Sequence, residues 1–261
     1  RRLDFLQSLQ NPSPASPALI WLQTPPETAD FLRLERPSIF PEFIDLLEPG
    51  SRPGKSRLHE EGFYYIFDPA SVLMALPAYQ LRGQISTVLD MCASPGGKSV
   101  FLQAALSPHQ MVSNEVVKNR LAPLIANLKR CKVPSSVTQK DPSTFAKEMT
   151  DQFDLVFVDA PCSGQSLVAK GESAPGCFHP SAVNGCRLRQ RRVVAESLSA
   201  VKPGGYLVYS TCTYSREENE DIVEWLLERT PGLETVEVPS LAPWRSDLSP
   251  HQSYRFLPDK I

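Results

Sequence analysis

From about residue 68 onward, the apolar positions of the chain form two kinds of run. Some runs are short and nearly continuous, as in parallel strands covered on both faces, and others recur with the spacing of one helix face. We predict strands at 87–92, 111–116, 135–141, 153–160 and 204–211, of which "FDLVFVDA" is the strongest. We predict helices at 68–81, 96–106, 118–131, 187–201 and 215–230.

Two of these helices carry signals at their N-terminal ends. Asp68 and Pro69 suit the N-cap and the first helical position, whereas Pro77 is expected to end or kink the same helix. Ser215 with Glu218 three residues later predicts a capping box. The regular alternation of strand and helix predicts an α/β fold with a doubly wound, parallel sheet and right-handed crossovers.

The first part of the chain has a different character, because prolines are dense between residues 11 and 54. This composition predicts a small or loosely structured N-terminal lobe at 1–60, followed by a larger domain at 61–261. Within the lobe, "ALIWLQ" predicts a strand and "PEFIDLLEP" a short helix.

The charge balance gives no global sign of nucleic-acid binding, since 27 basic and 29 acidic side chains leave a net charge of −2. A nucleic-acid surface would therefore be a local patch. No run approaches the length of a membrane span, and the first residues lack a signal-peptide core. We expect a cytoplasmic protein with six reduced cysteines. Cys177, His179 and Cys186 lie close together but lack a usual zinc spacing, so we expect no metal.

Ligands of such sheets bind at the carboxyl ends of the strands, where "CASPGGK" at 92–98 forms a glycine turn and a helix start. The backbone N–H groups of this turn would suit a negatively charged group. It does not match a nucleotide P-loop, which requires glycine at position 92, where this chain has Cys92. A glycine turn alone is more often a tight connection than a site. Glu115 and Asp141 end the next two strands, where acids can reach a ribose or an adenine. Singly, each is more often a surface carboxylate or helix cap; together they indicate an adenosyl ligand.

Two cysteines follow neighbouring strands, Cys162 in "DAPCSG" and Cys212 in "STCTYS". Because neighbouring strands lie about 5 Å apart, the two thiols could face one small cavity. Cysteine is often just a small buried hydrophobe, which accounts for Cys131 but poorly for two cysteines in turns at the ligand edge. A thiolate near a helix N-terminus and Lys98 would have a lowered pKa and be nucleophilic.

The segments "GFYYIFDPAS", "DMCASPGGKS", "DAPCSG" and "KPGGYLVYSTCTYSREENE" resemble the NOL1/NOP2/Sun family of RNA cytosine-C5 methyltransferases, over residues 60–230 in the same order. The resemblance implies a Rossmann-like class I methyltransferase fold with a small N-terminal lobe, S-adenosylmethionine as cofactor, and ribosomal or transfer RNA as partner. We expect a monomer that binds neither membrane nor metal. The chain departs from the family at Gln165 and Ser166, where the family has Thr-Gly, and in the following loop to residue 186. After "YRFLPDKI" the family continues, so the C-terminal part is expected to be truncated or different.

The resemblance also implies a role for each residue of the site. Cys212 would add to C6 of cytosine and Cys162 would assist product release, while Asp159 bonds the N3/N4 edge and Lys98 positions the base. The residues implied in binding S-adenosylmethionine are Cys92, Ala93, Ser94, Pro95, Gly96, Gly97, Lys98, Glu115, Arg120, Asp141 and Asp159.

Two local basic clusters are candidates for RNA contact, which would make the affinity depend on salt. They are Arg33, Arg36, Arg52, Lys55 and Arg57, and then Arg187, Arg189, Arg191 and Arg192. For the second cluster, a solvated helix face is an equally good interpretation. A catalytically silent RNA-binding or assembly factor is the alternative function, which the presence of both thiols disfavours. A thiol redox protein is disfavoured because the cysteines lie on separate strands.

Overall fold

The computed structural model of the protein describes residues 9, 16–26 and 31–258. Within these, the chain divides into two compact units. The first, which we call the sheet unit, contains residues 16–26, 31–159 and 197–208, and the second, which we call the loop unit, contains residues 160–196 and 209–258. The predicted division into 1–60 and 61–261 stays a prediction.

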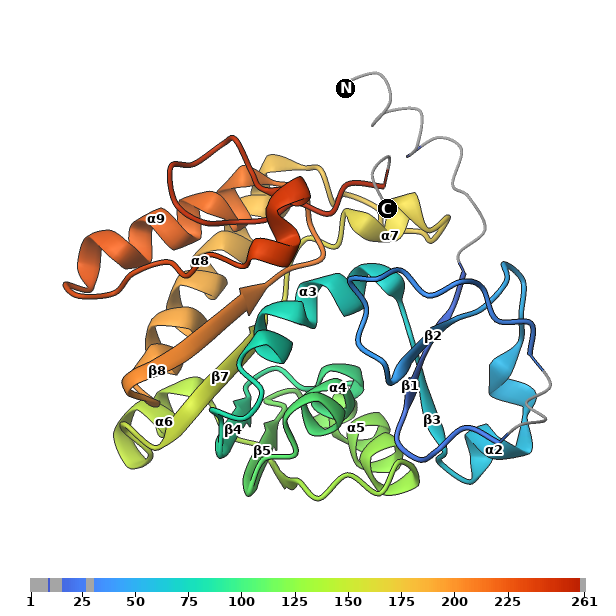
Figure 1. Ribbon diagram of the computed structural model, residues 1–261. Coiled ribbons are helices and arrows are strands. Elements are labelled where there is room, and N and C mark those ends of the chain that lie inside the picture. The colour runs from blue at the N-terminus through green and yellow to red at the C-terminus, as the bar shows by residue number, and fades with distance from the viewer. Residues whose placement is uncertain (1–8, 10–15, 27–30, 259–261) are drawn as a thin grey trace. The chain divides into compact units, whose positions relative to one another are not determined.

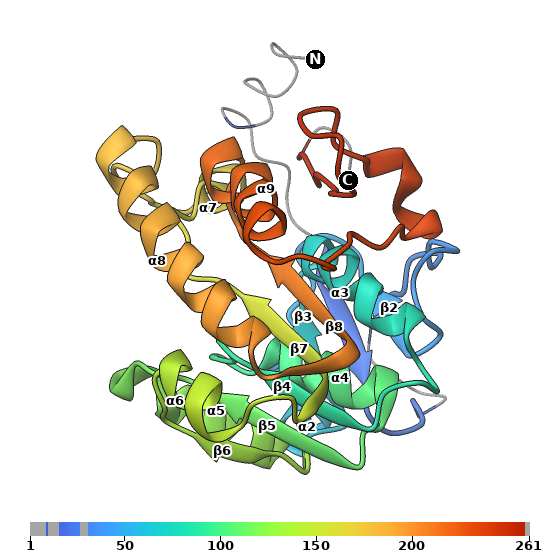
Figure 2. The same ribbon diagram turned by 90° about the vertical axis from the view of Figure 1, so that its left-hand side faces the viewer.

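The main sheet has five strands in the order β6-β5-β4-β7-β8 (Figures 1 and 2). β4 pairs in parallel with both β5 and β7, and β5 pairs in parallel with β6. The strands are β4 Thr87–Asp90, β5 Gln110–Asn114, β6 Ser136–Thr138, β7 Phe153–Asp159 and β8 Val201–Ser210. Because the first strand in sequence lies in the middle and the order reverses beside it, the predicted Rossmann-like α/β fold is confirmed.

Helices precede and connect these strands, as the apolar periodicity predicts. They are α3 Pro69–Gln80, α4 Gly97–Leu106, α5 Lys118–Arg130 and α6 Pro142–Glu148. The Asp68 carboxylate caps α3 by accepting from the Ser71 N–H at 3.2 Å. Of the two outcomes expected at Pro77, an end of the helix is wrong, because α3 continues to Gln80. The buried side chains Leu76 and Ala78 on either side keep this turn packed despite the missing N–H.

A second, small sheet precedes α3, with the antiparallel order β2-β1-β3 (Figure 1). Its strands are β1 Ala18–Trp21, β2 Ile44–Leu46 and β3 Tyr64–Phe67. The predicted helix over "PEFIDLLEP" is wrong, because this segment forms β2, in which Ile44 lies opposite Ile20. Strand pairing buries Ile44 completely, and the flanking prolines leave too few residues for a stable helix.

The loop unit contains α7 Ser166–Ala169, α8 Pro180–Leu198 and α9 Glu220–Arg229. α8 begins at Pro180 and not at 187, so part of the expected loop 165–186 is helical. Figure 2 shows α8 and α9 side by side, and the Arg191 guanidinium lies 5.1 Å from the centre of the Trp225 ring. No helix in the described part of the chain is long and apolar enough to cross a membrane.

The predicted capping box at the start of α9 is wrong. Arg216–Glu218 form a 3-10 turn, and the Ser215 hydroxyl donates to the exposed Glu217 at 2.6 Å. Glu218 is fully buried and binds residues far away in the sequence. In this buried position the Glu218 carboxylate accepts more hydrogen bonds than the single N–H group of a capping box would donate to it.

Candidate active site

In the sheet unit, the glycine turn connects β4 to α4. Gly96 has φ +114°, a conformation that strains any side chain. A Cβ at Gly97 would lie 2.7 Å from the Phe67 ring and 2.9 Å from the Tyr65 ring, so this glycine allows α4 to approach β3. One glycine therefore shapes the turn and the other serves packing, while the first N–H groups of α4 have no intrahelical acceptor.

Helix α5 holds the turn in place. The Ser94 hydroxyl donates to the Arg120 carbonyl at 2.8 Å, and the Arg120 guanidinium donates back to the Ser94 carbonyl at 2.7 Å. Asn127 donates to the Pro95 carbonyl at 2.9 Å. Burial, and then the charges of nearby acids, raise the pKa of the Cys92 thiol. Cys92 is therefore a neutral thiol.

Two buried acids at the strand ends each have an oxygen that accepts no hydrogen bond from the described residues: Asp90 Oδ1 and Glu115 Oε2. Their other oxygens accept from the Ser99 hydroxyl at 2.6 Å and from the Val117 N–H at 2.9 Å. Arg120 Nη1 lies 3.6 Å from Glu115 Oε2, beyond a good hydrogen bond. Burial raises the pKa of Asp90 to about 7.

Such oxygens suit a ligand that brings O–H or N–H donors, and the ribose hydroxyls and ammonium of S-adenosylmethionine are donors of this kind. The residues present therefore fit the expected cofactor. Sequence reasoning missed Asp90, although it stands two residues before the glycine turn. Asp141 caps α6 by accepting from the Ser143 N–H at 3.1 Å, which is the structural role the sequence left open. Its part in cofactor binding stays a prediction.

Lys98 and Asp159 form an ion pair with 3.1 Å between Nζ and Oδ2. Lys98 stands in the first turn of α4 and is buried, while Asp159 ends β7 and is one-third exposed. The Lys98 ammonium also lies 5.4 Å from the centre of the Phe67 ring. Two residues with expected roles toward the base are thus in direct contact.

In the loop unit, the two expected thiols lie together. The Sγ atoms of Cys162 and Cys212 are 2.8 Å apart, and the Cys212 N–H donates to Cys162 Sγ at 3.2 Å. Neither cysteine forms a disulfide. The hydrogen bond with Cys212, and then burial, raise the pKa of Cys162. Cys162 is therefore held as a protonated thiol against its neighbour.

Gln165, where the chain departs from the family, ties the following loop to the second cysteine segment. Its buried amide donates to the Cys177 carbonyl at 3.1 Å and accepts from the Tyr214 N–H at 3.0 Å. The Ser166 N–H donates to the Cys212 carbonyl at 3.0 Å. The unusual residues after "DAPCSG" thus support the turn that carries Cys212.

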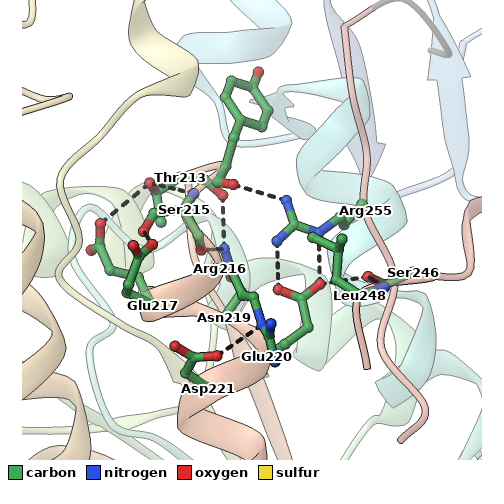
Figure 3. A network of polar contacts seen from close by, with 12 residues as sticks. Thr213, Ser215, Arg216, Glu217, Asn219, Glu220, Asp221, Ser246, Leu248 and Arg255 are labelled. Carbon is green, nitrogen blue, oxygen red and sulfur yellow. Dashed lines mark hydrogen bonds and ion pairs between the residues drawn. The ribbon is translucent and has the colours of Figure 1, made fainter. Parts of the chain in front are cut away.

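A network near the end of the chain supports the same segment (Figure 3). The buried Glu220 accepts from the Arg255 Nε and the Ser246 hydroxyl, each at 2.6 Å. Arg255 also donates to the Tyr214 carbonyl at 2.8 Å. Burial alone raises the pKa of Glu220, but these hydrogen bonds outweigh it and leave the pKa below its ordinary value.

The two basic clusters differ in their partners. In the first, Arg33 pairs with Asp45 at 3.2 Å and Arg57 with Glu61 at 2.6 Å. In the second, Arg187 donates to the uncharged Asn184 side chain at 2.8 Å. Among the described residues, no group of three or more His, Cys, Asp or Glu side chains could hold a metal ion.

Comparison with known proteins places this geometry among methyltransferases. A family model described as 16S rRNA methyltransferase RsmB/F matches residues 80–261. Ribosomal RNA small subunit methyltransferase F of Pectobacterium carotovorum is 33% identical over 186 residues, which are 70% of this chain and 38% of that protein. The protein of the same name from Escherichia coli O157:H7 is 32% identical over 241 residues, or 87% of this chain and 50% of that one. The chain thus spans half or less of these two relatives.

Solved structures show the same fold. A methyltransferase homolog protein from Pyrococcus horikoshii superposes with a TM-score of 0.78 at 22% identity, covering 99% of this chain and 86% of that one. NSun6 from the same organism gives a TM-score of 0.60 at 24% identity and covers 75% of this chain and 51% of that one.

Proposed function

The chain belongs to the RsmB/F family of 16S rRNA methyltransferases, and we propose that it methylates C5 of a cytosine in RNA with S-adenosylmethionine as methyl donor. The observation that carries the proposal is the contact of the Cys162 and Cys212 thiols at 2.8 Å. The names of the curated relatives favour ribosomal RNA as the substrate. We expect a cytoplasmic monomer.

A protonated Cys162 beside the Cys212 thiol suits this chemistry. C5 of cytosine is a weak nucleophile, so the Cys212 thiolate adds to C6, and the electron pair of the C5–C6 double bond becomes available at C5. S-adenosylmethionine would supply, when bound, a methyl group on a positively charged sulfur. C5 would bond to this methyl carbon as the bond between methyl and sulfur breaks, which would leave the sulfur as a neutral thioether. Loss of the C5 proton to a base then expels the Cys212 sulfur from C6 and restores the ring, a release that Cys162 assists.

Charged groups of the sheet unit have roles of their own in the proposal. Asp159 would bond the N3/N4 edge of the cytosine and stabilise the ring that gains a proton during addition, and Lys98 would position the base. Asp90 and Glu115 would accept hydrogen bonds from the cofactor, whose carboxylate suits the N–H groups at the start of α4. The segment from Cys92 to Lys98, together with Arg120, Asp141 and Asp159, completes the proposed cofactor site.

The exposed side of α8 is the proposed RNA contact. No acidic residue stands between Glu172 and Glu196, so the arginines at 187, 189, 191 and 192 form a local basic stretch in a chain with net charge −2. Phosphate contacts of this kind bind without sequence preference and weaken with salt. A paired cytosine would have to leave the RNA helix to reach the half-buried Cys212 thiol.

Methyl transfer to RNA tests the proposal. The protein is incubated with radiolabelled S-adenosylmethionine and either ribosomal or transfer RNA, and Cys212→Ala and Cys162→Ala are compared with wild type. Cys212→Ala should transfer no methyl group and form no adduct. Cys162→Ala should accumulate a protein–RNA adduct that survives denaturation, because release is impaired.

Cys131→Ala is the matched control, since Cys131 is a buried thiol outside the proposed site, and it should keep the wild-type rate. If Cys212→Ala and Cys162→Ala both behave like wild type, the mechanism is wrong. If wild type transfers no methyl group to any RNA, a silent RNA-binding factor becomes the better interpretation.

A further inference from the structure

The fully buried Glu218 joins the two segments that carry the cysteines. Ser163 directly follows Cys162, and it donates to Glu218 through its N–H at 2.9 Å and its hydroxyl at 2.6 Å. Thr213 directly follows Cys212, and its hydroxyl lies 3.3 Å from Glu218 Oε1 and 2.9 Å from the Ser163 hydroxyl. One carboxylate therefore holds the neighbours of both thiols.

Helix α8 supplies a third residue that donates to Glu218. The buried Gln190 amide donates to Glu218 Oε2 at 2.9 Å and to the Pro161 carbonyl at 3.0 Å. Pro161 directly precedes Cys162, so the first cysteine is held on both sides. Ser163 and Gln190 each bring an N–H donor to Oε2, and hydroxyls supply Oε1, which leaves neither oxygen unsatisfied.

We infer that Glu218 is a positioning residue, which fixes the separation of the Cys162 and Cys212 thiols without touching the substrate. The inference rests on the proposed function, in which the Cys212 sulfur adds to C6 and Cys162 assists its release. Both events need the sulfur atoms at set positions relative to one base. A displacement of about 1 Å in such a site can cost on the order of 100-fold in rate.

The contact with Gln190 also connects the thiols to the proposed RNA surface. Gln190 is completely buried, whereas Arg189 beside it in α8 is exposed. RNA bound to the exposed side of α8 would therefore contact the same helix that contributes Gln190 to Glu218.

Steady-state kinetics of methyl transfer to ribosomal RNA test the inference in the full chain. Glu218→Ala should lower kcat about 100-fold and leave KM for S-adenosylmethionine within about twofold, because cofactor binding does not use this carboxylate. Glu218→Gln should lose only about 10-fold, since its carbonyl keeps the two N–H donors and the hydroxyls can turn to accept from its amide. Ser163→Ala should also lose about 10-fold, because only part of the contact disappears.

Glu217→Gln is the matched control, because it makes the same chemical change one residue away on an exposed side chain, and it should behave like wild type. Should Glu218→Ala fail to fold, Glu218→Gln and Ser163→Ala decide: wild-type kcat in both would overturn the inference. A loss of kcat matched by an equal rise in KM for S-adenosylmethionine would overturn it as well.

Alkylation of the thiols separates this inference from the proposed function, because it needs neither RNA nor cofactor. Iodoacetamide modification of Cys162 and Cys212, followed by peptide mass spectrometry, should change in rate at least about fivefold in the Glu218→Ala variant, because the lost buried hydrogen bonds no longer hold the cysteine segments. The rate should not change in Glu217→Gln. Unchanged alkylation rates in folded Glu218→Ala would overturn the positioning role. An inactive wild type with altered alkylation in Glu218→Ala would instead overturn the methyltransferase proposal alone.

Discussion

Among the residues that the structure describes, four carboxylates are almost completely buried, and their hydrogen-bond partners differ between the two units. In the sheet unit, Asp90 and Glu115 each have one oxygen with no hydrogen-bond donor among the described residues. In the loop unit, Glu218 and Glu220 receive donors at both oxygens. An unsatisfied buried acceptor costs about 1–3 kcal/mol. The difference agrees with the proposals that a ligand completes the acids of the sheet unit and that those of the loop unit position the thiol segments.

The largest expected effect is on the free energy of unfolding, when a buried carboxylate loses its hydrogen-bond donors. Arg255→Ala would leave Glu220 buried without its charged partner (Figure 3), which typically costs about 3–5 kcal/mol. Urea denaturation followed by circular dichroism should show this loss in the free energy of unfolding at pH 7. Arg245→Ala is the control, since Arg245 is exposed and bonds only surface groups, and it should change stability by less than about 1 kcal/mol.

The pH dependence follows from the lowered pKa of Glu220. A carboxylate whose pKa is lower in the folded state stabilises the fold above its unfolded pKa and loses that contribution as the pH falls through its folded pKa. The difference in stability between wild type and Arg255→Ala should therefore shrink below about pH 4. A constant difference down to pH 2 would contradict the ion-pair interpretation.

Asp90→Asn is expected to have the next largest effect. The contribution of Asp90 to stability falls as the pH rises, opposite to that of Glu220. The pKa of Asp90 is raised to about 7, so the folded state holds a proton that the unfolded chain releases near pH 4. This contribution is fully present below about pH 4 and is lost as the pH rises to 7, by an amount on the order of 4 kcal/mol at most. Asp90→Asn should flatten the fall of unfolding free energy between pH 4 and 7. An unchanged pH profile would show that Asp90 is ionised throughout in the fold.

The difference between the two units also explains what the sequence could predict. The strands of the main sheet, the glycine turn and the closeness of Cys162 and Cys212 were predictable, because short motifs at strand ends mark them and the parallel sheet brings those ends together. The ion pair between Lys98 and Asp159 was not predicted. The roles of these residues stay predictions. Asp90 was missed because the sequence does not show that one of its oxygens is left without a donor.

The wrong predictions concern segments whose local sequence pattern favours one structure while residues far away in the sequence stabilise another. Glu218 fits a capping box by spacing, but Ser163, 55 residues earlier, provides the donors that bury it. The segment that forms β2 looks helical by its apolar spacing, yet β1 pairs with it from more than 20 residues away. Arg255 had no sequence signal at all, because its partner Glu220 stands 35 residues before it.

The smallest expected effect is on cofactor affinity. Glu115→Gln should keep the Val117 N–H bond through its carbonyl and place an amide nitrogen at the position of Oε2, which has no hydrogen-bond donor among the described residues. A donor there would face the cofactor's donors and the Arg120 guanidinium, so the Kd for S-adenosylmethionine should rise about 10-fold, or about 1.4 kcal/mol. Isothermal titration calorimetry measures this. Because the wild-type oxygen is unsatisfied, the free energy of unfolding without cofactor should not fall. Glu148→Gln is the control, because it changes an exposed acid paired with Lys140, and it should alter neither the Kd nor the free energy of unfolding. A Glu115→Gln variant that is less stable but has an unchanged Kd would make Glu115 a structural residue like Glu220.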